Sequence, residues 1–182
     1  MRGVWAAAGI AALAAGAVLT GGGSAQATSS YAGKCKDALG VTEVVDLEDL
    51  PATTHVVTRC APTNIAGKPF SGTGLAALTA AGFTFAGTAQ YGTAFVCRVN
   101  GRPTSTEYLS IPGNSRYQEK CLSTPPGSAY WGYWHATNGG TWTYSSYGAS
   151  TYKVTGGGFE GWAFEHNKTS TTLVRPRVTP TR

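Results

Sequence analysis

The sequence contains few charged residues, and its Lys and Arg residues form no cluster. Asp, Glu, Lys and Arg make up 13% of the 182 residues, and the formal net charge is +5. Domains that bind nucleic acid usually carry a basic patch or stripe, and none is found here. This argues against a nucleic-acid partner, whereas the mild basic excess suits loose attraction to anionic cell-wall polymers.

Motifs of common enzymes and metal sites are also missing. The sequence has no G-x-S-x-G, no H-E-x-x-H and no phosphate-binding loop. None of its four cysteines forms a C-x-x-C pair, which argues against a zinc site. We therefore expect a non-enzymatic protein without catalytic residues, a metal site or an obligatory cofactor. An extracellular hydrolase, built on Glu160 with Glu165 or on a histidine, is the third hypothesis below.

Only one long apolar run occurs, and it lies at the N-terminus. Arg2 precedes the run Val4–Leu19, and Ser24–Ala27 supplies an A-x-A cleavage site. This arrangement is typical of a secretory signal peptide. We predict that residues 1–27 are removed and that no membrane span remains after cleavage. The mature protein is then expected to be secreted and extracellular, with cell-wall association as an option.

Four cysteines remain in the predicted mature chain: Cys35, Cys60, Cys97 and Cys121. An even number in an oxidising compartment indicates two disulfides. Three connectivities are open, and we favour Cys35–Cys60 with Cys97–Cys121 because each bridge would staple a local hairpin or loop. Closing a loop of this size typically stabilises a fold by about 3 kcal/mol.

The middle of the chain shows patterns of both strands and a helix. Residues 41–47 and 55–61 alternate as two paired strands, and residues 93–99 form another. Residues 75–82 predict one short helix, with Ser71 or Thr73 as its N-cap.

The C-terminal end of the folded region is predicted from the loss of hydrophobic periodicity. Periodicity disappears from Asn167 onward, so we predict a flexible tail over residues 167–182. A single small, disulfide-stapled domain is expected over residues 28–166.

The stretch Ala129–Phe164 carries more than half of the aromatic residues in the chain. The segments Asn138–Gly140 and Gly156–Gly158 interrupt it, and their residues tolerate positive φ. The stretch therefore predicts three or four short strands joined by tight turns.

The turn after Thr137 decides which aromatic side chains share a face. A two-residue turn would place His135 opposite Trp142 and Tyr133 opposite Tyr144. One face would then carry Trp131, Tyr133, His135, Trp142 and Tyr144. A three-residue loop would instead move Trp134 onto this face, because a slip of one residue reverses which side chains of a strand point to each side of the sheet. In either register this face is the core of a small domain or, in part, an exposed platform for a flat ligand.

Several motifs, in this order, resemble one family. They are Thr73–Leu75, Ala80–Phe83, Phe95–Gly101, Tyr130–Trp134, Trp142–Ser145, Gly148–Ala149, Tyr152–Val154 and Glu160–Phe164. The set resembles the small secreted bacterial domains that are similar to the C-terminal domain of transcobalamin and intrinsic factor, especially actinobacterial ones. The resemblance covers roughly residues 41–164. It implies an α+β, β-grasp-like domain with mainly antiparallel strands: a hairpin, one helix crossing the sheet, then further strands.

The resemblance also implies a ligand. In the animal carriers this domain helps to hold cobalamin against a helical barrel of the same chain. Here the barrel is lacking, so a second protein could complete the site. By the resemblance His135 could be the lower ligand of a corrin cobalt, and the alternative is a structural histidine.

These observations lead to three hypotheses. The first is a secreted, monomeric, non-catalytic module that binds a small molecule, with cobalamin as a candidate. The candidate ligand-binding residues are Trp131, Tyr133, Trp134, His135, Trp142 and Tyr144. The second is a protein that contacts cell-wall glycan or other carbohydrate through the same aromatic residues, and the third is the hydrolase.

Overall fold

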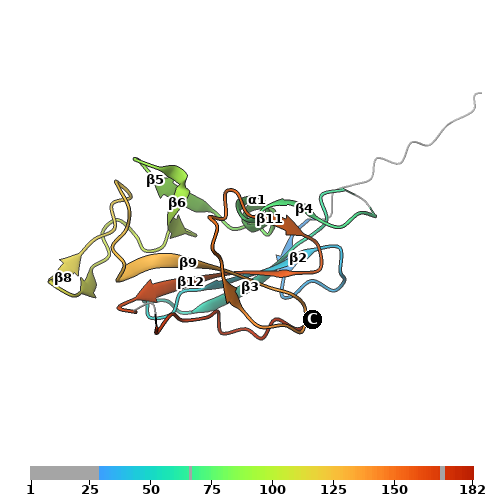
Figure 1. Cartoon of the computed structure of the whole chain (residues 1–182). Coiled ribbons are helices and arrows are strands. Elements are labelled where there is room, and N and C mark those ends of the chain that lie inside the picture. Colours follow the sequence, from blue (N-terminus) through green and yellow to red (C-terminus); the bar gives the residue numbers. More distant parts are fainter. Residues whose placement is uncertain (1–28, 66, 169–170) are drawn as a thin grey trace, which may run out of the picture.

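A six-stranded sheet forms the centre of the computed structural model (Figure 1). The strands, in spatial order, are β1 (Tyr31–Ala32), β3 (Val56–Ala61), β2 (Val41–Asp46), β12 (Phe159–His166), β9 (Ala129–Ala136) and β10 (Thr143–Tyr144). The structure describes residues 29–65, 67–168 and 171–182. The predicted signal peptide, residues 1–27, lies outside the described residues.

The hairpin of the first two long strands was anticipated from the alternation in the sequence. β2 and β3 form the predicted antiparallel hairpin, with Val45 opposite Val57. β12 pairs antiparallel with β9 over its whole length and parallel with β2 on its other edge. β12 therefore has a neighbour on each edge, which makes it a central strand.

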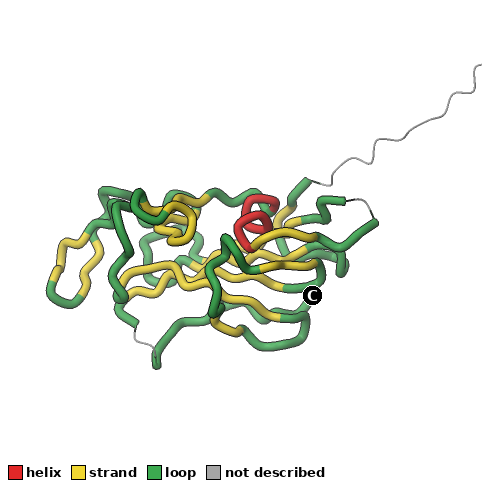
Figure 2. Tube along the Cα trace, turned by 45° about the horizontal axis from the view of Figure 1, so that its top comes forward, coloured by secondary structure: helices red, strands yellow, loops and turns green. Residues whose placement is uncertain are grey.

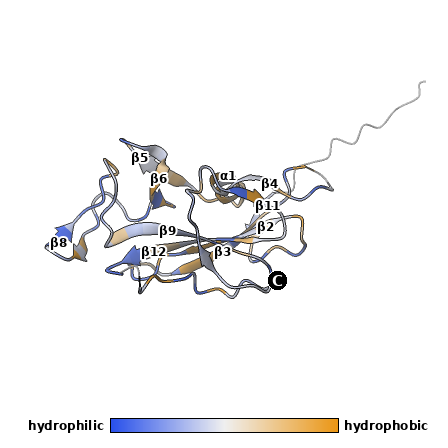
Figure 3. Cartoon of the chain, in the orientation of Figure 1, coloured by the Kyte–Doolittle hydropathy of each residue, from blue (hydrophilic) through white to orange (hydrophobic). Residues whose placement is uncertain are grey.

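Three two-stranded sheets surround the central one. They are β4 (Ser71–Thr73) with β11 (Lys153–Thr155), β5 (Phe85–Thr88) with β6 (Gly92–Val99), and β7 (Leu109–Ile111) with β8 (Asn114–Tyr117). The β7–β8 hairpin extends from one end of the molecule, and β8 is strongly hydrophilic (Figure 3). Together these elements form a small α+β domain of mainly antiparallel strands.

The single helix among the described residues, α1 (Gly74–Ala80), lies on one face of the sheet (Figures 1 and 2). The side chain of Thr73 accepts a hydrogen bond from the Ala76 amide, as expected for an N-cap. Gly82 follows the helix with φ +86°, a conformation that glycine adopts without steric cost. The predicted helix is confirmed, and Leu75 and Leu78 pack into the core as its apolar face requires.

The sheet buries side chains on both faces. On the face toward α1, Val45, Tyr133, Trp162 and Phe164 belong to a large cluster, here called the main core. The opposite face carries a smaller cluster, the second core, formed by Val44, Trp134, Trp142, Phe159 and Ala163. Because neighbouring residues of a strand point to opposite faces, β12 contributes alternately to the two cores.

The register of β10 decides between the two turns considered after Thr137. Thr143 pairs with His135 and Tyr144 pairs with Trp134, so a three-residue loop connects the strands. Gly139 adopts a positive φ of 78° in this loop. The slip of one residue places Trp134 on the same face as Trp142 and Tyr144, away from Tyr133, as the alternative register required.

The C-terminal segment, residues 171–182, packs against the sheet and does not form the predicted tail. It has no regular secondary structure, which explains the loss of sequence pattern, and runs along the face opposite α1 (Figure 1). Leu173 and Val178 cover the second core. The carbonyl of Val178 accepts a hydrogen bond from the Trp142 indole at 2.7 Å. The segment therefore seals an apolar face that would otherwise be exposed to water.

An ion pair between half-exposed Arg177 and buried Asp46 fixes the same segment. Arg177 donates to both carboxylate oxygens of Asp46, whose side chain is 0% exposed. Burial alone would raise the pKa of Asp46, but the hydrogen bonds from Arg177 outweigh it and lower the pKa. Asp46 therefore stays ionised and pairs with the segment.

Both favoured disulfides are confirmed, namely Cys35–Cys60 and Cys97–Cys121. Two disulfides are compatible with an extracellular protein. Within the described ranges, no helix has the length and apolar character needed to cross a bilayer.

The first prediction concerns the ion pair that holds the C-terminal segment. Arg177→Met leaves a buried carboxylate without its counter-ion, so we expect the free energy of unfolding to fall by about 1–3 kcal/mol. Arg175→Met, two positions earlier at an exposed site, is the matched control and should change stability by less than about 0.5 kcal/mol. Urea unfolding followed by tryptophan fluorescence measures both. Equal effects of the two variants would show that the ion pair does not fix the segment.

Candidate binding clefts

The six candidate ligand residues separate into three environments. Trp131, Tyr133 and Tyr144 line one cleft, and His135 lines another. Trp134 and Trp142 are 5% and 9% exposed and belong to the second core beneath the C-terminal segment. For these two tryptophans the interpretation as core residues fits, and the exposed platform does not.

The first of these, the aromatic cleft, has a volume of about 510 Å³. It lies where β6, β9 and the loop after β10 meet. None of the residues that line it is charged; its aromatic members are Phe95, Tyr130, Trp131, Tyr133, Tyr144, Tyr147 and Trp162. Ser145, Ser146 and Thr93 add hydroxyl groups. The cleft can therefore offer ring faces and neutral hydrogen-bonding groups to a ligand.

The nearly buried members form the floor of the aromatic cleft. Trp131 and Tyr133 are each 7% exposed. The Trp131 indole donates to the Arg102 carbonyl at 2.9 Å, and the ring of Tyr133 packs 5.0 Å from that of Trp162. These contacts hold the floor in place.

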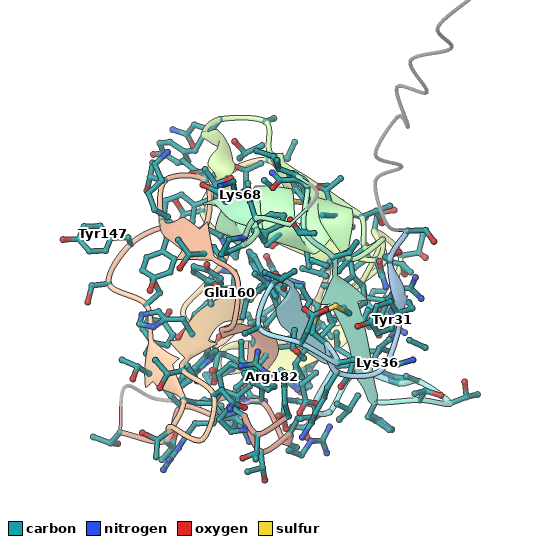
Figure 4. All side chains as sticks on the ribbon, turned by 90° about the vertical axis from the view of Figure 1, so that its right-hand side faces the viewer. Tyr31, Lys36, Lys68, Tyr147, Glu160 and Arg182 are labelled. Atoms are coloured by element: carbon teal, nitrogen blue, oxygen red, sulfur yellow. A yellow bond between two sulfur atoms is a disulfide. The ribbon has the colours of Figure 1, made fainter. Side chains whose placement is uncertain are left out.

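The exposed members form the rim. Phe95, Tyr144 and Tyr147 are 43%, 39% and 69% exposed. Tyr147 projects away from the body of the protein (Figure 4). Large aromatic side chains that stay in water around a cleft are typical of a binding site, because a ligand can cover them.

Sequence reasoning missed Phe95, Tyr130 and Tyr147 as members of this site. Phe95 comes from β6, more than thirty residues before β9, and no local pattern shows that the two strands meet. Tyr147 follows a two-residue strand in an irregular loop. The sequence pattern that could predict members of the site was the alternation in β9, and it predicted Trp131 and Tyr133.

A second cleft, here called the acid cleft, has a volume of about 350 Å³. His135, Tyr152, Glu160 and the turn Gly156–Gly158 line it. The ring of His135 stacks on that of Tyr152 at 4.7 Å and 15°. Burial lowers the pKa of His135, which keeps the imidazole neutral at physiological pH.

Glu160 belongs to a polar row that crosses the sheet on its helix side. Glu43 lies beside Glu160 on β2, and His135 lies beside it on β9. Glu43 and Glu160 are 0% and 4% exposed. The hydroxyl of Tyr133 donates to Glu160, whereas both carboxyl oxygens of Glu43 lack a partner among the described residues.

The pKa values of both acids are raised, so both carboxyl groups keep their protons to a higher pH than usual. Burial raises the pKa of Glu160 to about 8, although the hydrogen bond from Tyr133 acts in the opposite direction. Burial also raises the pKa of Glu43 well above its usual value, and the neighbouring Glu160 raises it further. Two buried carboxyl groups on adjacent strands cannot both ionise cheaply, so the pair is largely protonated at neutral pH.

Glu160 and Glu165 do not form a pair across one cleft. Their spacing of five residues in one strand puts them on opposite faces of the sheet. Glu165 accepts a hydrogen bond from the Val174 amide of the C-terminal segment at 3.1 Å. In the described part of the chain, no three His, Cys, Asp or Glu side chains gather closely enough to hold a metal ion.

Comparison with known proteins gives one match. A family model described as the SCO2322-like domain matches residues 124–182. This stretch contains β9 to β12 and the C-terminal segment, and so includes the floor of the aromatic cleft and most of the acid cleft. No curated protein and no solved structure matches the chain.

The buried acids predict an unusual pH dependence of stability. Glu160 titrates near 4.5 when unfolded and near 8 when folded, so the folded state binds more protons between these values. Stability therefore falls as pH rises through this window, by up to about 1.4 kcal/mol per pH unit for this group. Glu160→Gln, which cannot ionise, should make the profile less steep, with Glu43 as the remaining buried acid, and should be more stable than the wild type above pH 8. Thermal unfolding between pH 5 and 9 measures this.

The control for that experiment is Asp37→Asn, which removes a carboxylate at an exposed site. It should leave the slope of stability against pH as in the wild type. If Glu160→Gln retains the wild-type slope as well, Glu160 does not bind a proton on folding.

Proposed function

We propose that this chain is a secreted, non-catalytic binding module and that the aromatic cleft is its ligand site. One observation supports this proposal most strongly. The floor of the cleft, Trp131 and Tyr133, is nearly buried, whereas the aromatic side chains of its rim are exposed, namely Phe95, Tyr144 and Tyr147. Small-molecule sites are usually concave, mainly apolar and largely preformed, with a few polar groups that orient the ligand. The aromatic cleft has each of these properties.

The lining favours a flat, uncharged ligand. Ring faces of Tyr and Trp gain most from stacking against a flat group, and the cleft has no charged residue to balance an ionic one. The resemblance to the transcobalamin C-terminal domain makes a cobalamin-like molecule the first candidate. The order of hairpin β2–β3, helix α1 and later strands β9 and β12 supports the β-grasp-like architecture which that resemblance implies. His135 lies in the acid cleft, so it is not among the contacts proposed for the ligand.

The compartment belongs to the same proposal. The N-terminal sequence has the pattern of a secretory signal peptide, and two disulfides are compatible with secretion. We propose a monomeric mature domain, with the C-terminal segment as part of it. A second protein that covers the exposed rim could complete the site.

Carbohydrate binding is the alternative function, and one observation favours it. Exposed Tyr144 and Tyr147 lie on either side of Ser146, whose hydroxyl is at an exposed position, and this combination suits a sugar ring. A cell-wall glycan would, however, fit best on an open row of coplanar rings. The concave floor at Trp131 favours the small molecule.

Substitution of the rim tests the assignment of the site. Tyr147→Ala and Phe95→Ala remove exposed rings, so we expect both variants to fold and to bind cyanocobalamin about tenfold more weakly, since one stacking contact contributes up to about 1.5 kcal/mol. Tyr108→Ala is the matched control, because Tyr108 is 56% exposed, lies outside the cleft and contacts Arg116. Isothermal titration measures the affinities.

Native mass spectrometry of the protein purified gently from culture medium identifies the ligand without assuming it. An adduct of small-molecule mass supports the proposal, and a corrinoid adduct names the ligand. Binding to insoluble cell-wall glycan that depends on Tyr147, with no binding of cyanocobalamin, would favour the carbohydrate alternative. Binding that is unaffected by both rim variants would exclude the aromatic cleft.

A further inference from the structure

The acid cleft contains polar groups that the fold itself does not use. Within the described ranges no side-chain hydrogen bond is formed by the ring nitrogens of His135, the hydroxyl of Tyr152 or the second carboxyl oxygen of Glu160. All three residues line the same cleft of about 350 Å³. None of these atoms is among the buried side-chain atoms that lack a partner in the described part of the chain, so they face the solvent of the cleft and can exchange it for the donors of a ligand.

No positively charged side chain among the described residues forms an ion pair with Glu43 or Glu160, although Lys153 is one of the residues that line the cleft. Arg59 is beside Glu43 in the sheet, but its guanidinium donates to the Ala81 carbonyl and to Ser30. Lys153 is on the rim at an exposed position of β11, where Val154 is the residue that points inward.

The C-terminal segment brings Arg182 to the edge of the cleft, where its guanidinium donates to the Gly157 carbonyl at 2.8 Å and forms no ion pair with either acid in the described part of the chain. Helix α1 and strand β4 contain no charged residue, and β9 contributes only Tyr133 and neutral His135. The pair Glu43 and Glu160 therefore stays neutral by holding protons, at the cost of leaving both oxygens of Glu43 without a hydrogen bond.

We propose that the acid cleft binds a primary ammonium group, R–NH₃⁺. Such a group has three N–H donors. The cleft offers three acceptors for them: the carboxylate of Glu160, a ring nitrogen of His135 and the hydroxyl oxygen of Tyr152. The stacked rings of His135 and Tyr152 form an apolar wall for the carbon chain next to the nitrogen. This site is separate from the aromatic cleft and does not depend on the function proposed for it.

Binding is coupled to the loss of one proton from the acid pair. Glu160 must ionise to pair with the cation, and the released proton goes to the solvent. Because the pKa of Glu160 is about 8, only about a tenth of the molecules are ionised at pH 7. The affinity for an ammonium group should therefore be about tenfold higher at pH 9 than at pH 7, a range in which an alkylammonium stays protonated as lysine does.

Nuclear magnetic resonance titration tests the proposal with a small probe. Propylammonium chloride is added to the isotope-labelled chain at pH 9, with sodium chloride as the ionic-strength control. The aromatic resonances of His135 and Tyr152 should shift in a saturable manner. 1-Propanol has a similar size and shape but no charge, and it should give less than a tenth of the affinity. Equal binding of propanol would overturn the proposal.

A matched pair of variants locates the charge. Glu160→Gln keeps the shape of the side chain and removes its ability to ionise, so it should weaken propylammonium binding at least tenfold at pH 9. Glu165→Gln makes the same change five residues along the same strand, at a buried carboxyl on the opposite face, and should bind as the wild type does. Retained binding in Glu160→Gln, or an equal loss in both variants, would overturn the proposal.

The wild type provides a test that does not depend on the folding of any variant. Titrations at pH 7 and pH 9 should differ about tenfold in affinity. An affinity that is the same at both values would show that no acid in the cleft ionises on binding.

Discussion

Strand β12 is the element on which the rest of the structure depends. It is hydrogen-bonded on both edges, to β2 and to β9, and its residues from Phe159 to Glu165 are buried. Trp162 and Phe164 face the main core, while Phe159 and Ala163 face the second core. A strand buried on both faces needs a cover on each side, since an open apolar face would remain in contact with water. Helix α1 covers one face, and the C-terminal segment covers the other.

This constraint explains why the C-terminal residues could not be interpreted from their sequence. Residues 171–182 form no helix or strand, and their prolines prevent regular pairing, so the segment has no periodic pattern to detect. Its role follows from what lies beneath it, namely Trp134, Trp142 and Phe159. The pairing of Asp46 with Arg177 joins residues 131 positions apart, a separation that no local rule addresses.

Local signals predicted the rest of the fold well. The alternation in residues 41–47 and 55–61, the cap at Thr73 and the even number of cysteines each gave an element or link that the structure contains. The turn after Thr137 was harder, because loops of two and three residues are both compatible with Asn138–Gly140 and differ only in which face Trp134 occupies. Only part of the candidate site could be predicted from the sequence. Trp131 and Tyr133 follow from strand alternation, whereas Phe95 and Tyr147 reach the cleft through long-range packing. The acid pair needed the parallel register of β2 and β12, which places Glu43 beside Glu160.

The loop between β10 and β11 contacts helix α1 and lines both the aromatic cleft and the acid cleft. The carbonyls of Tyr152 and Ala149 accept hydrogen bonds from the first two amides of α1, at Gly74 and Leu75. The same loop supplies Ser145 to Ala149 to the aromatic cleft and Tyr152 to the acid cleft. It is thus a common wall between two cavities and the cap of the helix at once. A substitution that displaces this loop therefore alters the lining of both cavities and the cap of the helix together.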